Sequence, residues 1–540
     1  MLIDAREVST GKEFACDLCV VGAGPAGIAI ADRLRGSGLS VVLLESGGRN
    51  VDVPSQGLYC GEIRGHGYYR LDACRWRLFG GGTTRWGGWC RPLEAVDFTE
   101  RGWLPYSGWP ITAQALEPYE ADAARLFELP NARFDLDAWR HRLADPLPLE
   151  ASHFEHVVFQ HSPETDFGQR YGARLFGAAN ITTMLHANLT QIRLAAGSSR
   201  VSELQVATLT GRHFMVRPTV VVLAAGAIEN ARLLLASGAD RPAGLGNESD
   251  MVGRCFMEHL HVVAGHLLMS ERAGNNDFCA KTILEDVRLR GVITPTVAAL
   301  DRHRLLATSI AVENPSHAMG TPFVGWPPAI TFPAVRWYRT LRQGSLKPVA
   351  NGLKILAQRM QMLRSQARTW NMSRVARSQA LGASSSDRIY SLYFRAEQAP
   401  DPANRVTLSE RRDALDLPRS RLEWRVNPID IAGITGWLAV LDRDVRARGL
   451  GQVVGPPDDW QRHINGGPHH MGTTRMSADP RHGVVDADCR VHSVENLYVA
   501  GSSVFATGGY ANPTFTLVTL ALRLADTLRR RLQATPQMRQ

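Results

Sequence analysis

The feature that most constrains this fold is a glycine-rich turn that joins an apolar strand to a helix near the N-terminus. Residues 14–21 predict a buried strand, the residues up to 35 predict a helix, and residues 40–44 predict a second strand. A strand–helix–strand unit of about 30 residues places its two strands parallel in a doubly wound sheet. The sequence therefore predicts an α/β domain at this end of the chain.

The turn itself predicts a dinucleotide site. Gly22, Gly24 and Gly27 have the spacing G-x-G-x-x-G. The first permits a tight turn, the second lets the backbone approach a pyrophosphate, and the third lets the helix pack on the strand. The helix N-terminus offers free N–H groups to the phosphates. Glu45, at the end of the second strand, would accept hydrogen bonds from a ribose diol and repel a 2′-phosphate, which favours NAD or FAD over NADP.

The rest of the chain predicts a second domain inserted into the first. A chain of 540 residues is too long for one simple core, and nucleotide-domain patterns recur in three separated stretches. The predicted helices are near 113–127, at 227–236, 335–375, 429–448 and 514–532. The predicted strands are strand pairs over 181–194 and 201–216, buried strands at 219–224 and 497–499, antiparallel strands over 261–300, and strands within 388–409 and 421–426.

The net charge of +9 is a local feature. Residues 331–380 contain ten basic residues and no acidic one, so they carry +10 and the rest of the chain carries −1 (9 − 10). This segment is able to meet an acidic partner, an anionic membrane surface or an anionic substrate, although a solvated helical face or a self-association surface is the more common role. Nucleic-acid binding has little support, because no recognised module accompanies the charge.

The sequence predicts a cytoplasmic protein. No stretch reaches the roughly 18 uninterrupted apolar residues needed to span a bilayer. The N-terminus carries Asp4 and Glu7 and lacks the basic region and apolar core of a secretory signal. Eight cysteines without a framework spacing indicate reduced thiols. Cys16 and Cys19 form a C-x-x-C, but their place at the entry to an apolar strand favours packing over a redox or zinc site.

Three further segments bear on the choice between NAD and FAD. Residues 80–88, GGGTTRWGG, place glycines beside hydroxyls, which implies a backbone pressed against a ligand. Residues 221–232, VVLAAGAIENAR, predict a strand, a small-residue turn and a helix. The third segment is the run from His469 to Leu520.

With these segments the sequence resembles the glucose–methanol–choline (GMC) oxidoreductase family over nearly its whole length. The matching motifs, in the family's order, are VVGAGPAG with LLESGG, GGGTTRWGG, AAGAIENARLLLAS, VGRCFMEH, EQAPDPANRVTLS, HHMGTTRM, GVVDADCRVHSVENLYVAGSSVF and GGYANPTFT. The GYANPTFT ending is more similar to the bacterial sugar and polyol dehydrogenases and pyranose oxidases than to the choline or aryl-alcohol branches.

The resemblance implies an FAD-binding domain, expected at residues 1–100, 170–262 and 465–540, and a substrate domain with an antiparallel sheet, expected at 101–169 and 263–464. It implies that Glu45 binds the adenosine ribose and that Leu189 lies by the adenine. Some sugar-oxidising relatives bond a histidine covalently to the flavin where this chain has Arg85, so non-covalent FAD is expected. The residues expected to bind the cofactor are Gly22, Gly24, Gly27, Glu45, Ser46, Gly81, Gly82, Thr83, Thr84, Trp86, Gly88, Leu189, Ala225, Gly226, Glu229, Gly501, Ser502, Pro513 and Thr514.

The chemistry of alcohol oxidation points to a catalytic pair. A hydride must leave carbon for flavin N5, and a proton must leave the hydroxyl. A neutral histidine suits the base role because its ordinary pKa, about 6.5, lies near working pH, and an asparagine can hold the alcohol oxygen without titrating. The family's catalytic histidine stands three positions before a Gly-Thr pair, which selects His469 over His470, and its partner position maps to Asn512. The ordinary alternatives are a hydrogen-bonded core histidine and a helix cap.

Other polar and aromatic residues of these segments have structural alternatives. His469 with His470, and His259 with His261, bring no third ligand at a recognisable spacing, so no metal is expected. Aromatic side chains able to wall the site are Trp86, Trp89 and Tyr510.

The leading interpretation is FAD-dependent oxidation of a sugar, aminosugar or polyol hydroxyl with His469 as the base. The alternatives are a hydroxynitrile lyase-type enzyme that keeps FAD for structure, oxidation of a non-sugar primary alcohol, and a non-enzymatic binding role through the basic segment 331–380. The sequence leaves open which alcohol is the substrate, the oligomeric state, and whether oxygen, a quinone or a protein accepts the electrons.

Overall fold

The N-terminal glycine turn lies in a mixed eight-stranded sheet. The computed structural model describes residues 1–238, 241–270, 273, 277–279, 282–283, 287–313, 389–456 and 458–534. The strand order is β1–β7–β3–β2–β10–β9–β8, with β20 beside β10. The strands are β1 (Leu2–Asp4), β2 (Glu13–Val21), β3 (Val41–Leu44), β7 (Ile181–Leu185), β8 (Asn188–Leu194), β9 (Val201–Ala207), β10 (His213–Leu223) and β20 (Leu497–Val499). Strand β2 pairs in parallel with both β3 and β10, which confirms the predicted doubly wound arrangement.

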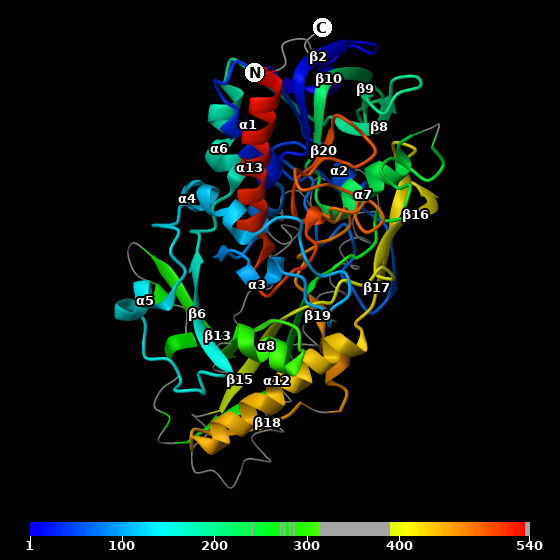
Figure 1. The fold of residues 1–540 in the computed structure, drawn as a ribbon. Helices are drawn as coiled ribbons and strands as arrows, with labels where there is room; N and C mark the ends of the chain where they lie inside the picture. Colours follow the sequence, from blue (N-terminus) through cyan, green and yellow to red (C-terminus); the bar gives the residue numbers. More distant parts are fainter. Residues whose placement is uncertain are drawn as a thin grey trace, which may run out of the picture.

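Helices cover this sheet. Helix α1 (Pro25–Arg33) begins directly after the glycine turn and packs against α13 (Pro513–Ala534) and α6 (Phe167–Phe176). Helix α4 (Glu117–Leu126) packs on α13, while α7 (Ala227–Ala236) lies against β8 (Figure 1). Small and apolar residues fill most of α1, and every residue from 26 to 31 is buried, so the helix approaches the sheet closely.

Two strand predictions differ from the structure. The sequence predicts separate strands over 201–216 and 219–224, but β10 runs unbroken through Pro218. Its first part pairs antiparallel with β9, and residues 215–223 pair in parallel with β2. Strands β7 and β8, expected as a pair, instead bond to β3 and to β9. Local pattern shows that these segments are strands, but the partner of each strand depends on the tertiary fold.

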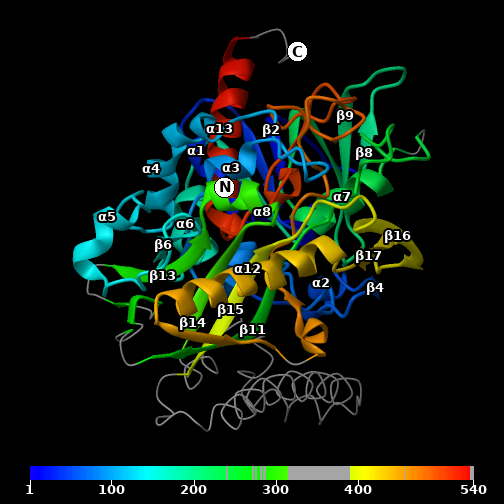
Figure 2. The same cartoon turned by 60° about the horizontal axis from the view of Figure 1, so that its bottom comes forward.

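The predicted antiparallel sheet forms the second layer. Its order is β18–β11–β15–β14–β13–β6–β5, with β12 beside β13 and β19 beside β11. The strands are β5 (Trp89–Cys90), β6 (Phe154–His161), β11 (His259–Met269), β12 (Thr282–Ile283), β13 (Arg288–Pro295), β14 (Thr308–Glu313), β15 (Ile389–Glu397), β18 (Gly451–Val454) and β19 (Asn465–Gly466). Helix α12 (Pro428–Ala447) packs against β18, β15 and β11 (Figure 2).

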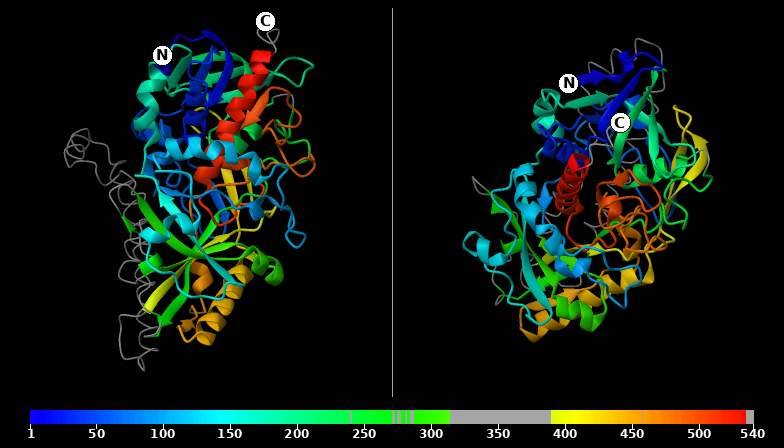
Figure 3. Two further views of the ribbon diagram at one scale, coloured as in Figure 1. Left: turned by 60° about the vertical axis from the view of Figure 1, so that its left-hand side comes forward. Right: turned by 45° about the horizontal axis from the view of Figure 1, so that its top comes forward.

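The two large sheets occupy opposite halves of the molecule (Figure 3), and the N-terminal strand β1 lies in the half that holds β2 and β10. One face of the antiparallel sheet carries a row of polar side chains. His261 and Ser309 both pair with Arg395 across the central strand β15, so these three side chains project from the same face.

A three-stranded sheet joins distant parts of the chain. Its order is β16 (Arg405–Arg412), β17 (Pro418–Trp424) and β4 (Glu62–Gly65), with β4 parallel to β17. Helix α7 packs against β16 and β17, which ties this sheet to the first domain (Figure 1).

Some predictions remain untested. The antiparallel sheet includes β5 and the start of β11, which lie within the ranges predicted for the FAD domain, so the domain boundaries stay predictions. The basic segment 331–380 and the helix predicted over 335–375 lie outside the described residues. Among the described helices, none has the length and apolar character needed to cross a bilayer. All eight cysteines are free thiols.

Candidate active site

His469 and Asn512 meet in the structure. His469 follows β19, and Asn512 directly precedes α13, whose first residue is Pro513. The distance from His469 Nε2 to Asn512 Nδ2 is 3.1 Å. The fold therefore brings together two side chains that the sequence analysis paired only by resemblance.

A second imidazole lies behind the first. His259, at the start of β11, is fully buried, and its Nδ1 lies 2.9 Å from Nδ1 of His469. Its Nε2 lies 3.2 Å from the carbonyl oxygen of Gly508. The sequence analysis weighed His259 only as a metal ligand. Among the described residues there is no group of three or more potential ligands that could hold a metal ion.

Arg395 contacts the other end of the pair. It lies near the C-terminal end of β15, is 4 % exposed, and donates from Nη1 to Asn512 Oδ1 at 3.0 Å. Its guanidinium carbon lies 4.3 Å from the centre of the Trp89 ring. Burial lowers the pKa of Arg395 to about 10, so it is a cation at neutral pH. No motif in the sequence predicts a role for Arg395. The one available signal is that it is a lone arginine within an apolar strand pattern, which indicates a buried charge.

Both imidazoles are neutral at neutral pH. Burial, together with the neighbouring His259, His261 and Arg395, holds the pKa of His469 well below its ordinary value. Burial lowers the pKa of His259 to about 4. A neutral His469 has one nitrogen without a proton, and that nitrogen is able to accept one from a substrate.

A buried carboxylate fixes the loop that carries His469. Glu258 accepts hydrogen bonds from the backbone N–H of Gly467 (2.9 Å) and of His469 (2.8 Å), and Tyr68 donates its hydroxyl to the same carboxyl group. Burial raises the pKa of Glu258 to about 7. His470 Nε2 lies 2.8 Å from the Tyr68 hydroxyl, so the ring of His470 is turned toward Tyr68 and Glu258.

The glycine turn is tightly packed at Gly27 but leaves free space beside the backbone of Gly24. A Cβ on Gly27 would lie 1.9 Å from the carbonyl oxygen of Gly22, so only glycine lets α1 start there. By contrast, a Cβ on Gly24, on Gly226 or on the buried Gly501 would meet nothing within 4 Å. Bare backbone facing open space at the turn and at the ends of β10 and β20 fits a cradle for a dinucleotide.

Loop 80–88 lies against the same turn. A Cβ on Gly81 would be 2.9 Å from the Cα of Gly24, so the two segments are in close contact. The hydroxyl groups of Thr83 and Thr84 donate to backbone carbonyls within the loop, at 2.7 Å and 2.8 Å. Trp86 donates its indole N–H to the carbonyl of Thr165. The threonine hydroxyls therefore shape the loop, and its backbone remains to meet a ligand.

Glu45 and Arg77 border the turn at the predicted ribose position. The buried Glu45 carboxylate accepts from the backbone N–H of Ala23 (3.0 Å) and of Gly47 (2.7 Å). Arg77 donates from Nε to the Ser46 hydroxyl at 3.0 Å, and its buried Nη1 has no hydrogen-bond partner among the residues described. An unsatisfied buried donor beside a ribose-binding carboxylate fits a polar ligand such as the adenosine part of FAD. The sequence analysis missed Arg77.

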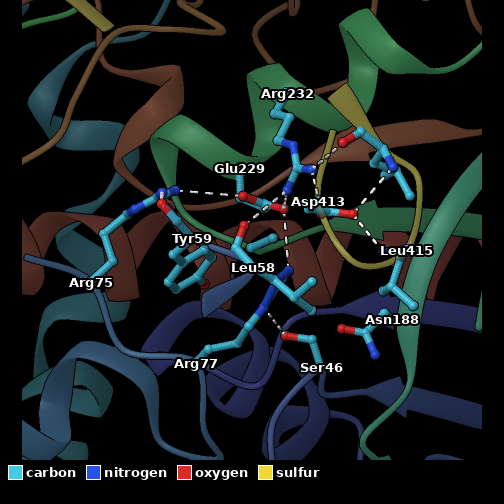
Figure 4. A network of polar contacts seen from close by, with 12 residues as sticks. Ser46, Leu58, Tyr59, Arg75, Arg77, Asn188, Glu229, Arg232, Asp413 and Leu415 are labelled. Carbon is cyan, nitrogen blue, oxygen red and sulfur yellow. Dashed lines mark hydrogen bonds and ion pairs between the residues drawn. The ribbon is translucent and has the colours of Figure 1, made fainter. Parts of the chain in front are cut away.

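Glu229, predicted to bind the cofactor, lies at the centre of an arginine network (Figure 4). Its carboxylate pairs with Arg232 at 3.0 Å, Arg77 at 3.2 Å and Arg75 at 3.5 Å. Burial alone would raise its pKa, but the arginines outweigh burial and lower it. Arg232 also pairs with Asp413, which connects α7 to the loop between β16 and β17. Any contact of Glu229 with a cofactor stays a prediction.

The remaining predicted cofactor residues lie at strand ends and helix starts. Ser502 donates its hydroxyl to the carbonyl of His470 at 2.7 Å, so the loop after β20 touches the histidine loop. A Cβ on Gly88 would lie 2.6 Å from the carbonyl oxygen of Ser162. Leu189 is buried in β8, Ala225 follows β10, and Pro513 and Thr514 begin α13.

Comparisons with known families agree with this architecture. Residues 400–521 match a family model described as GMC oxidoreductase, and residues 17–252 match one described as FAD dependent oxidoreductase. Pyridoxine 4-oxidase from Mesorbium loti has a similar fold, with a TM-score of 0.53 and 16% identity over 95% of this chain and 99% of that one. A fungal aryl-alcohol oxidase gives a TM-score of 0.54 at 15% identity, covering 96% of this chain and 99% of that one.

Three relatives are similar in sequence. The 2-methyl-1,2-propanediol dehydrogenase of Mycolicibacterium austroafricanum is 26% identical over 64% of this chain and 54% of its own length. The fructose dehydrogenase large subunit of Gluconobacter japonicus is 26% identical over 58% and 48%. The match therefore spans about half the length of these two relatives. The 6'''-hydroxyparomomycin C oxidase of Streptomyces lividus is 25% identical over 96% of this chain and 92% of its own length.

Proposed function

This chain belongs to the GMC oxidoreductase family, and we propose that it uses FAD to oxidise a hydroxyl group of a sugar, an aminosugar or a polyol to a carbonyl group. The observation that carries this proposal is the contact between His469 Nε2 and Asn512 Nδ2, two partly buried side chains. The names of the relatives support the substrate class, since they include a diol, a hexose and an aminoglycoside.

The chain's own residues supply the proton chemistry and the orientation. Bound FAD supplies the electron chemistry, because it accepts the hydride that leaves the alcohol carbon. His469 Nε2 accepts the hydroxyl proton, so the C–H and O–H bonds break, the C=O bond forms, and the proton remains on His469. In the structure Asn512 Nδ2 donates to the Nε2 lone pair, so the alcohol must replace this contact when it binds; Asn512 Nδ2 then donates to the alcohol oxygen and holds it beside Nε2.

The cradle of glycine backbone is proposed to hold FAD without a covalent bond. Glu45 would accept from the ribose, and the open backbone at Gly24, Gly226 and Gly501 would lie along the cofactor. Arg85, which stands where a histidine link is found in some relatives, is exposed and donates to the carbonyl of Thr84 at 2.9 Å. An arginine at this position forms no bond to a flavin, so denatured protein should release free FAD.

An anaerobic screen of flavin absorbance tests the proposed function. The purified protein, reconstituted with FAD, is mixed without oxygen with sugars, aminosugars, polyols and simple alcohols. Bleaching of the visible flavin band by a sugar or a polyol is the expected result. Turnover of a substrate without bleaching would instead indicate a lyase, and protein that stays colourless after incubation with FAD would overturn the proposal.

Replacement of the base should separate binding from chemistry. His469→Ala should keep the flavin absorbance and slow bleaching by about 10²–10⁴-fold, which is the range that general-base catalysis contributes. His266→Gln is the matched control. His266 is a buried histidine of β11 whose pKa is also lowered, to about 4, but it contacts Ser391 instead of His469 or Asn512. Rapid bleaching by His469→Ala would show that another group takes the proton.

Three further assignments belong to the same proposal. A cytoplasmic location is supported by eight free cysteines, which suit a reducing compartment. The electron acceptor is oxygen, a quinone or a protein, and comparison of turnover with each acceptor identifies it.

The basic segment 331–380 is proposed to meet an acidic partner or an anionic surface, and neutralising its arginines should leave flavin bleaching unchanged.

A further inference from the structure

Four side chains and one backbone carbonyl form a continuous chain of hydrogen bonds through the candidate active site. Arg395 Nη1 contacts Asn512 Oδ1 at 3.0 Å, and Asn512 Nδ2 contacts His469 Nε2 at 3.1 Å. His469 Nδ1 contacts Nδ1 of His259 at 2.9 Å, and Nε2 of His259 contacts the Gly508 carbonyl at 3.2 Å. The chain thus runs from β15 through the catalytic pair to β11 and the loop before α13.

The two ends of this chain are groups that cannot reverse their roles. A guanidinium has five N–H donors and no acceptor, so Arg395 can only donate to Asn512. A backbone carbonyl has no proton, so Gly508 can only accept from His259. Between these ends, an amide has one donor side and one acceptor side, and a neutral imidazole has one N–H and one bare nitrogen. Every link must therefore donate in the same direction.

We propose that Arg395 and His259 are positioning residues, which fix the Asn512 amide with its NH₂ toward His469 and fix His469 as the Nδ1–H tautomer with a bare Nε2. This inference rests on the proposed function, because a bare Nε2 is the form that a base needs. Arg395 fixes the amide, since its donor requires Oδ1 on that side. His259 fixes the tautomer, since the bare Nδ1 of its ring receives the Nδ1–H of His469.

The surroundings of Arg395 support a role directed at Asn512. Five of the six other buried arginines of the described residues are paired with carboxylates, as Arg101 is with Glu397 and Arg290 with Glu313. The sixth, Arg475, donates to two backbone carbonyls. Arg395 has no ion pair among the described residues, and its buried Nε has no hydrogen-bond partner there. Burying a guanidinium without a carboxylate partner lowers the stability of the fold. A role of Arg395 in orienting Asn512 explains why an arginine is present at this position.

The same charge strengthens the hydrogen bond that Asn512 offers. A cation bound to the carbonyl side of an amide polarises the amide and makes its N–H a better donor, because linked hydrogen bonds reinforce one another. The ring of Trp89 lies under the guanidinium and holds it without supplying a competing acceptor. Arg395 thus acts on the alcohol oxygen through Asn512, without contact with the substrate.

Tautomer measurement tests the inference without any turnover. Protein labelled with ¹⁵N-histidine is compared with the His469→Gln variant, and the signals that disappear belong to His469. In the wild-type protein we expect His469 to be neutral, with the proton on Nδ1. Arg395→Met and His259→Leu should each lose this single tautomer, while His266→Leu, a buried histidine of the same strand β11, should keep it.

Kinetics give a second and separate test. With FAD bound, Arg395→Met should slow flavin bleaching at saturating alcohol by at least about tenfold with little change in KM, and Arg395→Lys, which keeps the cation, should recover part of the rate. The acidic limb of the bleaching rate should move to higher pH in Arg395→Met, because the loss of a nearby cation raises the pKa of His469.

The outcomes distinguish this inference from the proposed function. The inference would be overturned by a proton on Nε2 of His469 in the wild-type protein. It would also be overturned by wild-type rates and pH dependence in Arg395→Met. If no alcohol bleaches the wild-type flavin, the proposed function fails, and the tautomer measurement still decides the inference. If Arg395→Met does not fold, the tautomer of the wild-type protein and the comparison with Arg395→Lys remain decisive.

Discussion

Arg77 connects the Glu229 network to the predicted ribose site, because one guanidinium contacts both Glu229 and Ser46. Arg77→Met should raise the Kd for FAD about tenfold or more, since a charged donor contributes about 1.5–3 kcal/mol to a buried hydrogen bond. Arg75→Met is the matched control. It also removes a cation from Glu229, but Arg75 donates to the Tyr59 and Leu71 carbonyls instead of Ser46. Fluorescence titration of the apoprotein measures both affinities, and an equal loss in the two variants would contradict a contact between Arg77 and FAD.

At the residue scale, motif spacing predicted the pairing of His469 with Asn512, and the structure places them in contact. The sequence could not predict the contacts of His259 and Arg395 with this pair. An alternating strand pattern indicates which side chains are buried, but the contacts between strands far apart in sequence depend on sheet order and register. Arg395 reaches Asn512 because β15 lies at the centre of a sheet whose partners the local pattern does not specify.

At the scale of an element, two glycines of the same turn should respond in opposite ways to alanine. Gly27→Ala should lower the free energy of unfolding by about 1–3 kcal/mol, because the new Cβ would overlap the Gly22 carbonyl and displace α1. Gly24→Ala should fold normally, since its φ of −80° suits alanine and its Cβ faces open space, but should bind FAD more weakly. Denaturant unfolding and FAD titration separate the two effects. Equal stability of the two variants would argue against the tight start of α1.

The longer elements with strong local patterns were predictable from the sequence, with boundaries a few residues from those observed, whereas β6, α6, α8 (Val297–His303) and β14 were not predicted. The glycine turn, α7, α12, β20 and α13 have strong local patterns and caps, such as the capping box and proline at the start of α12. The pairing of β4 with β17 was not predictable, because β4 has four residues and no apolar alternation. Such short strands form only where a distant partner supplies the hydrogen bonds.

At the scale of the whole molecule, buried ionisable groups of two kinds act on stability in opposite directions. Eight histidines have lowered pKa values: about 4 for His156, His259 and His266, about 3 for His470, well below 6.5 for His261 and His469, and lowered also for His186 and His303. Five carboxyl groups have raised pKa values: about 8 for Asp97, about 7 for Glu120 and Glu258, about 6 for Asp430, and a raised value also for Glu155. Burial is the largest cause in each of these groups.

These shifts predict a stability maximum between about pH 6 and pH 7. Below about pH 6.5 the unfolded chain protonates histidines that the folded protein keeps neutral, so stability falls as the pH falls. At higher pH the folded protein holds protons on the buried carboxyl groups that the unfolded chain has released, so stability falls as the pH rises toward 8. Each unbalanced proton changes the free energy of unfolding by about 1.4 kcal/mol per pH unit.

Thermal unfolding of the FAD-saturated protein from pH 5 to pH 8, at constant ionic strength, measures this dependence. The Tm should pass through a maximum, and a Tm that rises steadily to pH 8 would contradict the assignment of protonated carboxyl groups to the folded state. Glu258→Gln isolates one contribution, because glutamine keeps a carbonyl acceptor for the N–H groups of Gly467 and His469 but cannot release a proton. Its Tm should fall less steeply than that of the wild-type protein above pH 6. Its acidic limb should be steeper, because the proton that folded Glu258 holds between about pH 4.5 and pH 7 offsets part of the histidine effect in the wild-type protein.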